Sequence, residues 1–146
     1  MMKSDTDLLE REINKFLTNT IKKDDMYVLN ELRLNPCEMD VIALDPKSLT
    51  LTSFEIKKNK WKDLLFQAIR AKLYCHYSYA VMPKSKEKNI PINDFIENGI
   101  GIVLYSVKKD ELDFTFLNQP SLSDLINRNL KKRIYWEFYN KYGDLI

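Results

Sequence analysis

The chain has 146 residues, a formal net charge of +2, 45% hydrophobic residues and 30% charged residues, which fits a single globular domain spanning residues 1–146. No apolar run approaches the roughly 20 residues of a membrane-spanning helix, so we expect a soluble protein without a membrane segment. The net charge is also lower than that of the strongly basic domains that bind nucleic acid through charge alone.

The first half of the chain predicts one helix followed by three strands. Residues 5–21 carry apolar side chains at helical spacing, and Ser4, Asp5 or Thr6 is the expected N-cap. Three segments rich in apolar and β-branched residues predict strands, at residues 26–34, 38–45 and 49–57. Turn signals at Asn35-Pro36 and at residues 45–48 separate them. Because these connections are short, the strands should form an antiparallel meander.

The second half predicts, in order, a helix, a buried strand, a Lys-rich loop, a short helix, a hairpin and a last helix. Their ranges are 60–76, 77–82, 83–91, 92–97, 100–107 with 112–117, and about 122–142. Ser121 or Ser123 is the expected cap of the last helix. The helix at 60–76 lies between two strands, which predicts a right-handed crossover between parallel neighbours. The whole pattern predicts an α/β fold with a mixed sheet and helices on both faces.

Several residue types have a plain structural interpretation. Cys37 and Cys75 form no CxxC pair, so we expect packing residues rather than a zinc site or a disulfide. The single histidine, His76, excludes mechanisms that need two, and we interpret it as incidental at a helix end. The polar, acidic N-terminal segment does not have the pattern of a signal peptide, so we expect a cytoplasmic protein. The aromatic residues of the last helix are interpreted as core or interface packing rather than as a base-stacking platform.

The lysines and arginines gather in three clusters. They are Lys57, Lys58, Lys60 and Lys62, then Lys84, Lys86 and Lys88, and finally Arg128, Lys131, Lys132 and Arg133. Any one cluster is adequately explained as solvated surface. Three clusters in an almost neutral chain predict a polarised surface.

Two acidic residues on neighbouring strands mark a candidate site. Asp40 begins an apolar strand, and Glu55 ends the next one, two residues before Lys57. If the two strands pair through the turn at 45–48, both carboxylates lie at one end of the sheet. Paired carboxylates raise each other's pKa unless a cation lies between them. The alternative is a surface ion pair between Lys57 and one of these acids, which would contribute little energy.

Mg²⁺ or Mn²⁺ fits such a pair because hard divalent cations prefer oxygen ligands. Asp40, Glu55, the backbone carbonyl of Ile56 and water would supply them. A bound cation would polarise a phosphodiester and acidify an attacking water. Lys57 points the same way as Glu55 along the strand, and can orient that water or stabilise charge on the phosphorane.

Residues 26–83 resemble the core of the PD-(D/E)xK nuclease superfamily, which has the restriction-endonuclease-like fold. The resemblance is strongest to prokaryotic restriction-like and Holliday-resolvase-like members. It rests on an acid on the first strand, the strand Asp40–Leu44, Glu55-Ile56-Lys57, the helix start Trp61–Ala68 and the strand Tyr79–Pro83. Met39 stands where the motif has its proline, which removes no chemistry.

This resemblance implies a three-layer α/β/α sandwich with a central mixed β-sheet flanked by helices, and a metal-dependent DNA endonuclease. It implies Asp40 and Glu55 as metal ligands and Lys57 as the catalytic lysine. Gln67 would lie near the metal or the water, while Arg70 and Tyr74, on the same helical stripe, would contact phosphate. Lys58, Lys60 and Lys62 are further candidates for DNA binding. Glu31 is the first candidate for an additional acid, with Glu10 or Glu12 as the alternative.

Other functions remain open at this stage. One is a catalytically inactive nucleic-acid-binding module that keeps the fold, and another is an assembly subunit that uses its aromatic last helix. For an active nuclease, a chain this short has little room for an extended base-reading element. Recognition of a DNA junction or flap by a homodimer is therefore an option beside nonspecific and sequence-specific cleavage.

Overall fold

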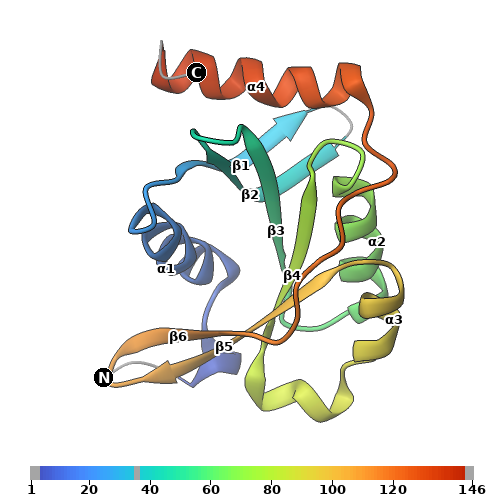
Figure 1. Ribbon diagram of the computed structural model, residues 1–146. Helices are drawn as coiled ribbons and strands as arrows, with labels where there is room; N and C mark the ends of the chain where they lie inside the picture. Colours follow the sequence, from blue (N-terminus) through green and yellow to red (C-terminus); the bar gives the residue numbers. More distant parts are fainter. Residues whose placement is uncertain (1–3, 35–36, 144–146) are drawn as a thin grey trace.

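A six-stranded mixed β-sheet organises the computed structural model, which describes residues 4–34 and 37–143 (Figure 1). In chain order the elements are η1 (Asp5–Asp7), α1 (Glu10–Lys22), β1 (Tyr27–Leu34), β2 (Cys37–Asp45), β3 (Thr50–Ile56), α2 (Trp61–Ala71), β4 (Tyr77–Pro83), η2 (Lys84–Asn89), α3 (Ile92–Glu97), β5 (Gly101–Lys108), β6 (Glu111–Phe116) and α4 (Arg128–Tyr142). None of the helices in the described ranges is long and apolar enough to cross a membrane.

Strand order in the sheet follows the chain, from β1 to β6. The pairs β1–β2 and β2–β3 are antiparallel, which confirms the predicted meander. The pairs β3–β4 and β4–β5 are parallel, so the chain crosses over through α2 and again through η2 and α3. The final hairpin, β5–β6, is antiparallel as predicted. The sheet is therefore mixed.

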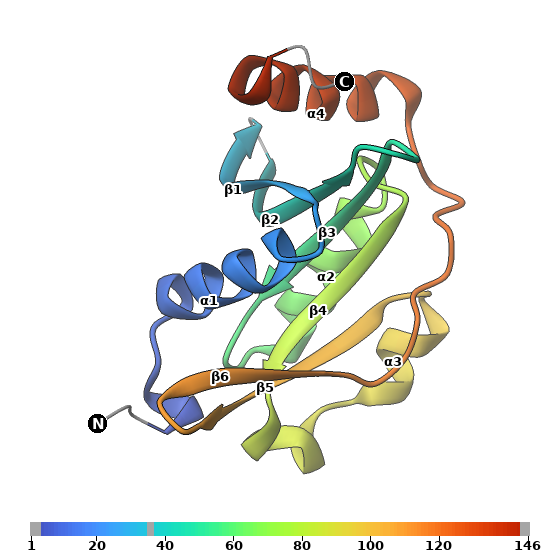
Figure 2. The same ribbon diagram turned by 60° about the vertical axis from the view of Figure 1, so that its left-hand side comes forward.

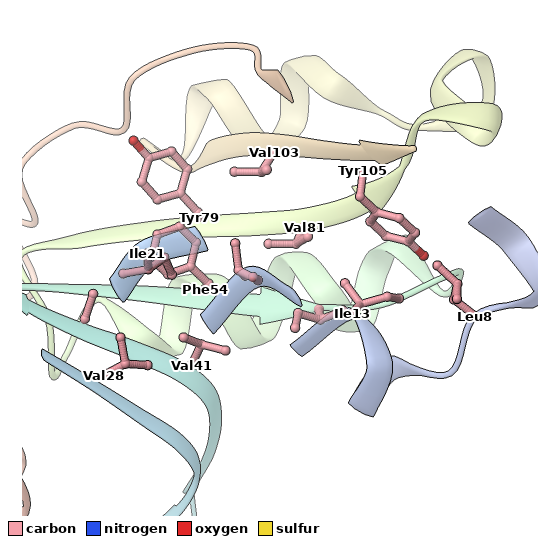
Figure 3. Close-up of a cluster of buried hydrophobic side chains, with 13 residues drawn as sticks. Leu8, Ile13, Ile21, Val28, Val41, Phe54, Tyr79, Val81, Val103 and Tyr105 are labelled. Atoms are coloured by element: carbon pink, nitrogen blue, oxygen red, sulfur yellow. The ribbon is translucent and has the colours of Figure 1, made fainter. Parts of the chain in front are cut away.

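Helices cover both faces of this sheet (Figures 1 and 2). On one face, α1 packs Ile13, Leu17 and Ile21 against valines of the central strands, as in the cluster of Figure 3. On the other face, α2 and α3 cover β4 and β5, while α4 packs Ile134 and Phe138 near β1 and β2. The predicted α/β architecture with helices on both faces is confirmed.

The alternation of side chains along β2 breaks at Asp40. Val41 and Ala43 pack on the α1 face, and Ile42 and Leu44 pack on the opposite face, as a regular strand requires. Met39 nevertheless packs on the same face as Ile42. The backbone carbonyl of Asp40 accepts a hydrogen bond from Asn14 Nδ2 of α1 at 3.0 Å. This irregular point of the sheet is where the acidic residues gather.

Three predicted helix boundaries are wrong. The first helix starts at Glu10, because residues 5–7 form a 3₁₀ turn and the N–H of Leu9 donates to Glu12 Oε1. The helix predicted at 60–76 ends at Ala71.

The last helix begins at Arg128 rather than near residue 122. Its cap is Asn127, whose side chain accepts hydrogen bonds from the N–H groups of Asn129 and Leu130. Ser123 is not the cap, because its hydroxyl donates a hydrogen bond to the carbonyl of Lys72 at 2.6 Å. The predicted turn at Asn35-Pro36 lies outside the described residues.

Candidate functional site

A polar cavity of about 310 Å³ opens where α1, β2, β3 and α2 meet. Its lining residues are Glu10, Glu38, Asp40, Glu55, Ile56, Lys57, Gln67 and Arg70. Most of the predicted site residues are therefore brought together in one place. A larger open pocket, of about 510 Å³, lies at the other end of β3, but its one carboxylate, Asp45, accepts a hydrogen bond from the backbone N–H of Lys47. It offers no paired acids.

The register of β2 and β3 explains why Asp40 and Glu55 are neighbours. Val41 pairs with Phe54, so Asp40 and Glu55 are the next residues outward on the two strands. Asp40 Oδ2 accepts a hydrogen bond from the backbone N–H of Ile56 at 2.8 Å. This bond fixes the Asp40 carboxylate against the end of β3.

Glu55 is a buried carboxyl group, only 2% exposed, and its Oε1 has no hydrogen-bond partner. Burial raises the pKa of Glu55 well above its ordinary value, and the neighbouring charge of Asp40 raises it further. A buried polar atom without a partner is costly, and such groups concentrate at functional sites. Glu55 is thus poised to accept a cation or a proton.

The pKa of Asp40 is also raised, but less strongly than that of Glu55. Burial raises the pKa of Asp40, and the charge of Glu10 adds to this, while the hydrogen bond from Ile56 and the charge of Lys57 act in the opposite direction. The two carboxyl groups therefore compete for one negative charge. A divalent cation between them would relieve that competition for both.

Cationic and amide side chains complete the wall of the cavity. Lys57 follows β3 directly, and its backbone N–H donates to the carbonyl of Val81 at 3.2 Å, which holds it at the end of the central strands. Gln67 and Arg70 come from α2, one turn apart. Arg70 Nε is buried without a hydrogen-bond partner. The cavity thus sets two acids beside cationic and amide donors.

Within residues 4–34 and 37–143, no three His, Cys, Asp or Glu side chains lie close enough to form a metal-binding group. Two carboxylates still suit Mg²⁺, which usually keeps several waters and takes only one or two protein carboxylates.

Comparisons with known proteins bear on the fold alone. No family model matches the chain, and no curated protein matches it. The solved structure of the SPO1766 protein of unknown function from Silicibacter pomeroyi is similar, with a TM-score of 0.65 and 13% sequence identity. The match covers 92% of this chain and 87% of that chain. The two proteins therefore share the α/β architecture despite their low sequence identity.

Glu31, the first candidate for an additional acid, lies outside the cavity. It is exposed, has a positive φ of 50°, and lines a neighbouring shallow pocket with Arg33, Glu38, Met39 and Asp40. The alternative acid Glu10 lines the cavity itself, because the start of α1 lies over the end of the sheet. Glu12 instead caps α1.

Tyr74 does not lie on the exposed stripe predicted for it. The helix ends at Ala71, so Tyr74 turns inward, is 5% exposed and packs in the core beneath α4. The predicted partly exposed position is therefore wrong, and its burial does not favour contact with phosphate. Lys58, Lys60 and Lys62 lie outside the cavity in the segment that leads from Lys57 into α2, with Lys60 and Lys62 exposed.

Sequence reasoning missed two residues. Glu38 lines the cavity and forms an exposed ion pair with Arg33 at 3.4 Å. Its position two residues before Asp40 on one strand was the available signal. His76 is not incidental, because its Nδ1 accepts a hydrogen bond from the N–H of Leu51 at 2.9 Å. Cys37 and Cys75 are buried, as predicted for packing residues.

Proposed function

We propose that this protein is a Mg²⁺- or Mn²⁺-dependent DNA endonuclease with a restriction-endonuclease-like α/β/α sandwich. The single observation that carries the proposal is the buried Glu55 carboxyl, unpartnered at Oε1, beside Asp40 in a cavity that also contains Lys57. A buried carboxyl oxygen without a hydrogen-bond donor is available to a cation.

The donor set fits a hard divalent cation. Asp40 Oδ2 accepts from Ile56, and Glu55 offers its unpartnered Oε1. The carbonyl of Ile56 is the proposed third ligand, since this residue lines the cavity. When bound, the cation would polarise the phosphodiester and acidify a water.

The remaining side chains take roles that follow from their places in the wall. Lys57 would orient the attacking water or stabilise charge on the phosphorane, and Gln67 would hold the water by a hydrogen bond. Arg70 would bind a non-bridging phosphate oxygen through its guanidinium group. In the reaction the water oxygen bonds to phosphorus, one ester P–O bond breaks, and the departing alkoxide gains a proton.

Nucleic acid is the proposed substrate because cationic residues continue outward from the cavity. Lys58, Lys60 and Lys62 follow Lys57 along the chain, where they can neutralise phosphates on either side of the scissile bond.

The test compares wild type with Asp40→Asn, Glu55→Gln and Lys57→Ala on supercoiled plasmid, single-stranded, flap and junction DNA with Mn²⁺. Lys47→Ala is the matched control, because this exposed lysine lies in the turn at the opposite end of β3. We expect each site variant to lose at least about a hundredfold in cleavage rate, and the control to be unaffected. Equal cleavage by wild type and all three variants would refute the proposal. DNA binding without cleavage on any substrate would favour the inactive binding module.

A further inference from the structure

The outer face of α4 carries an aromatic surface with two rings, Trp136 and Tyr139, that the core does not use. Lys132, Tyr135, Trp136 and Tyr139 line a shallow pocket of about 280 Å³, here called the α4 aromatic surface. Trp136 is 56% exposed and Tyr139 is 45% exposed. Their rings meet edge to face with centroids 5.5 Å apart. The inner face of the same helix supplies the core contacts through Ile134 and Phe138, so stability of the fold does not explain these outer rings.

One ring of the surface is held in place before any ligand arrives. The Tyr135 hydroxyl donates a hydrogen bond to the carbonyl of Leu49, which anchors one border of the surface. Trp136 and Tyr139 project from a regular helix that lies across the end of the sheet, with no other described element over its outer side (Figures 1 and 2). Rigid aromatic groups lose little conformational freedom when they bind, which favours recognition by stacking.

Charge favours an anionic partner. Lys132 lines the surface, and Arg133 is exposed beside it. Lys141 of the same helix lies inward, where its Nζ donates to the carbonyl of Val28. A symmetric dimer through this face would place like charges opposite one another, which disfavours a second copy of the chain. Phosphates combined with flat, apolar rings match both the charge and the aromatic groups.

A basic side chain, Arg133, follows the same row of α4 as the two exposed rings. Arg133, Trp136 and Tyr139 are three residues apart in succession and form a diagonal row across the outer side of α4. Arg133 is exposed, so its guanidinium group is available to an anion beside the two rings.

We infer that the α4 aromatic surface binds unpaired nucleotides of single-stranded DNA, with bases on Trp136 and Tyr139 and phosphates on Lys132 and Arg133. Duplex bases are already stacked on one another, so exposed rings discriminate in favour of unpaired ones. The inference rests on the proposed function for its choice of nucleic acid, and it deepens that function by naming a substrate with a single-stranded arm, such as a flap.

The experiment measures binding by fluorescence anisotropy, using a labelled oligothymidylate and a labelled blunt duplex in EDTA, so that no cleavage occurs. The double variant Trp136→Ala/Tyr139→Ala should raise the Kd for the single strand about tenfold or more, and the Kd for the duplex by less than about threefold. Phe116→Ala is the control, because Phe116 is an aromatic residue of similar exposure, 49%, on β6.

A second variant tests the charge component without touching the rings. Lys132→Ala/Arg133→Ala should reduce the slope of log affinity against log salt for the single strand by about 1.4, the value for two lost phosphate contacts. Both side chains are exposed, so the fold is expected to survive.

The inference is overturned if the aromatic double variant binds the oligothymidylate within about threefold of wild type. It is also overturned if light scattering shows a wild-type dimer that this variant dissociates while single-strand binding is unchanged, since a second copy would then cover the surface. Failure of the proposed hydrolysis is a separate result. If the protein passes these binding tests but cuts no DNA, only the proposed nuclease activity is refuted. If it cuts DNA but fails the binding tests, only this inference is refuted.

Discussion

Asp40 and Ile56 are joined by a hydrogen bond of 2.8 Å, from the backbone N–H of Ile56 to Oδ2 of Asp40. The bond lies where the β2–β3 ladder stops, one residue beyond Val41 on β2 and two residues beyond Phe54 on β3. It occupies one oxygen of the carboxylate and fixes this group beside Glu55. The same interaction therefore ends the ladder and positions the first carboxylate of the site.

Substitutions at Asp40 should separate these two roles. In Asp40→Asn the side-chain carbonyl can still accept from Ile56, so stability should change little while divalent-ion binding is lost. In Asp40→Ala the buried N–H of Ile56 loses its acceptor, which should cost about 1–3 kcal/mol of unfolding free energy. Guanidinium chloride unfolding and Mn²⁺ titration calorimetry, applied to both variants, measure the two effects. Equal stability of the two variants would mean that water replaces the lost acceptor.

The raised pKa of Glu55 predicts how stability varies with pH in the absence of metal. In the folded state Glu55 holds its proton above its ordinary pKa of 4.5, so the folded state binds more protons than the unfolded state there. Stability should therefore fall as the pH rises from about 4.5 through the folded-state pKa.

Glu55→Gln removes this group, so its stability should fall less over the same range. At neutral pH without metal it should be more stable than wild type by about 1–3 kcal/mol, because no charge is then buried. Added Mn²⁺ should stabilise wild type and leave Glu55→Gln unchanged. Thermal unfolding in EDTA and in Mn²⁺ measures both, and identical pH profiles for the two proteins would contradict the role given to Glu55.

Much of the site could be predicted because it depends on local, periodic features. Side-chain alternation along β3 and the short turn before it placed Glu55 beside Asp40, and helical periodicity placed Gln67 and Arg70 on one side of α2. The mixed sheet followed from the order of strands and helices.

The errors have separate physical causes. Glu31 was expected in the site, but its positive φ of 50° turns the strand locally, and nothing in a Leu-rich pattern indicates a left-handed residue there. Tyr74 was misplaced because helical spacing was extended past Ala71, where the helix ends without a glycine or proline to mark the end. Ser123 and Asn127 are both acceptable caps by residue type, and the tertiary bond from Ser123 to Lys72 decides between them.

Arg70 offers a test of substrate binding that leaves the carboxylates intact. Its Nε is buried and unpartnered in the wall of the cavity, so we expect it to bind phosphate in the transition state. Arg70→Ala should lower kcat/KM for DNA cleavage about a hundredfold, while Mn²⁺ affinity stays near that of wild type. Arg70→Lys keeps the charge but not the guanidinium fork, and should recover only part of the loss. Arg11→Ala, an exposed arginine on α1, is the control. An unchanged rate in Arg70→Ala would remove Arg70 from the site.

His76 should control the stability of the segment that leads to α4. Its Nδ1 accepts from the N–H of Leu51 at 2.9 Å, which requires an unprotonated Nδ1, and its carbonyl accepts from the N–H of Ser123 at 2.8 Å. Burial lowers the pKa of His76 below its ordinary 6.5, and the charge of Lys131 lowers it further. The unfolded state then binds more protons in this range, so the contribution of His76 is complete above pH 6.5 and is lost as the pH falls toward the folded-state pKa.

Two substitutions isolate that contribution. His76→Asn can keep an acceptor near the position of Nδ1 and carries no proton, so the stability that wild type gains relative to it should diminish as the pH falls below 6.5. His76→Ala leaves the Leu51 N–H unpaired and should lose about 1–3 kcal/mol at every pH above that range. Denaturant unfolding across this pH range measures both effects. Asp40 and Glu55 change the free energy of unfolding in the opposite direction as the pH falls, so each variant is compared with wild type at the same pH. A wild-type advantage over His76→Asn that does not vary with pH would show that protonation of His76 does not affect folding.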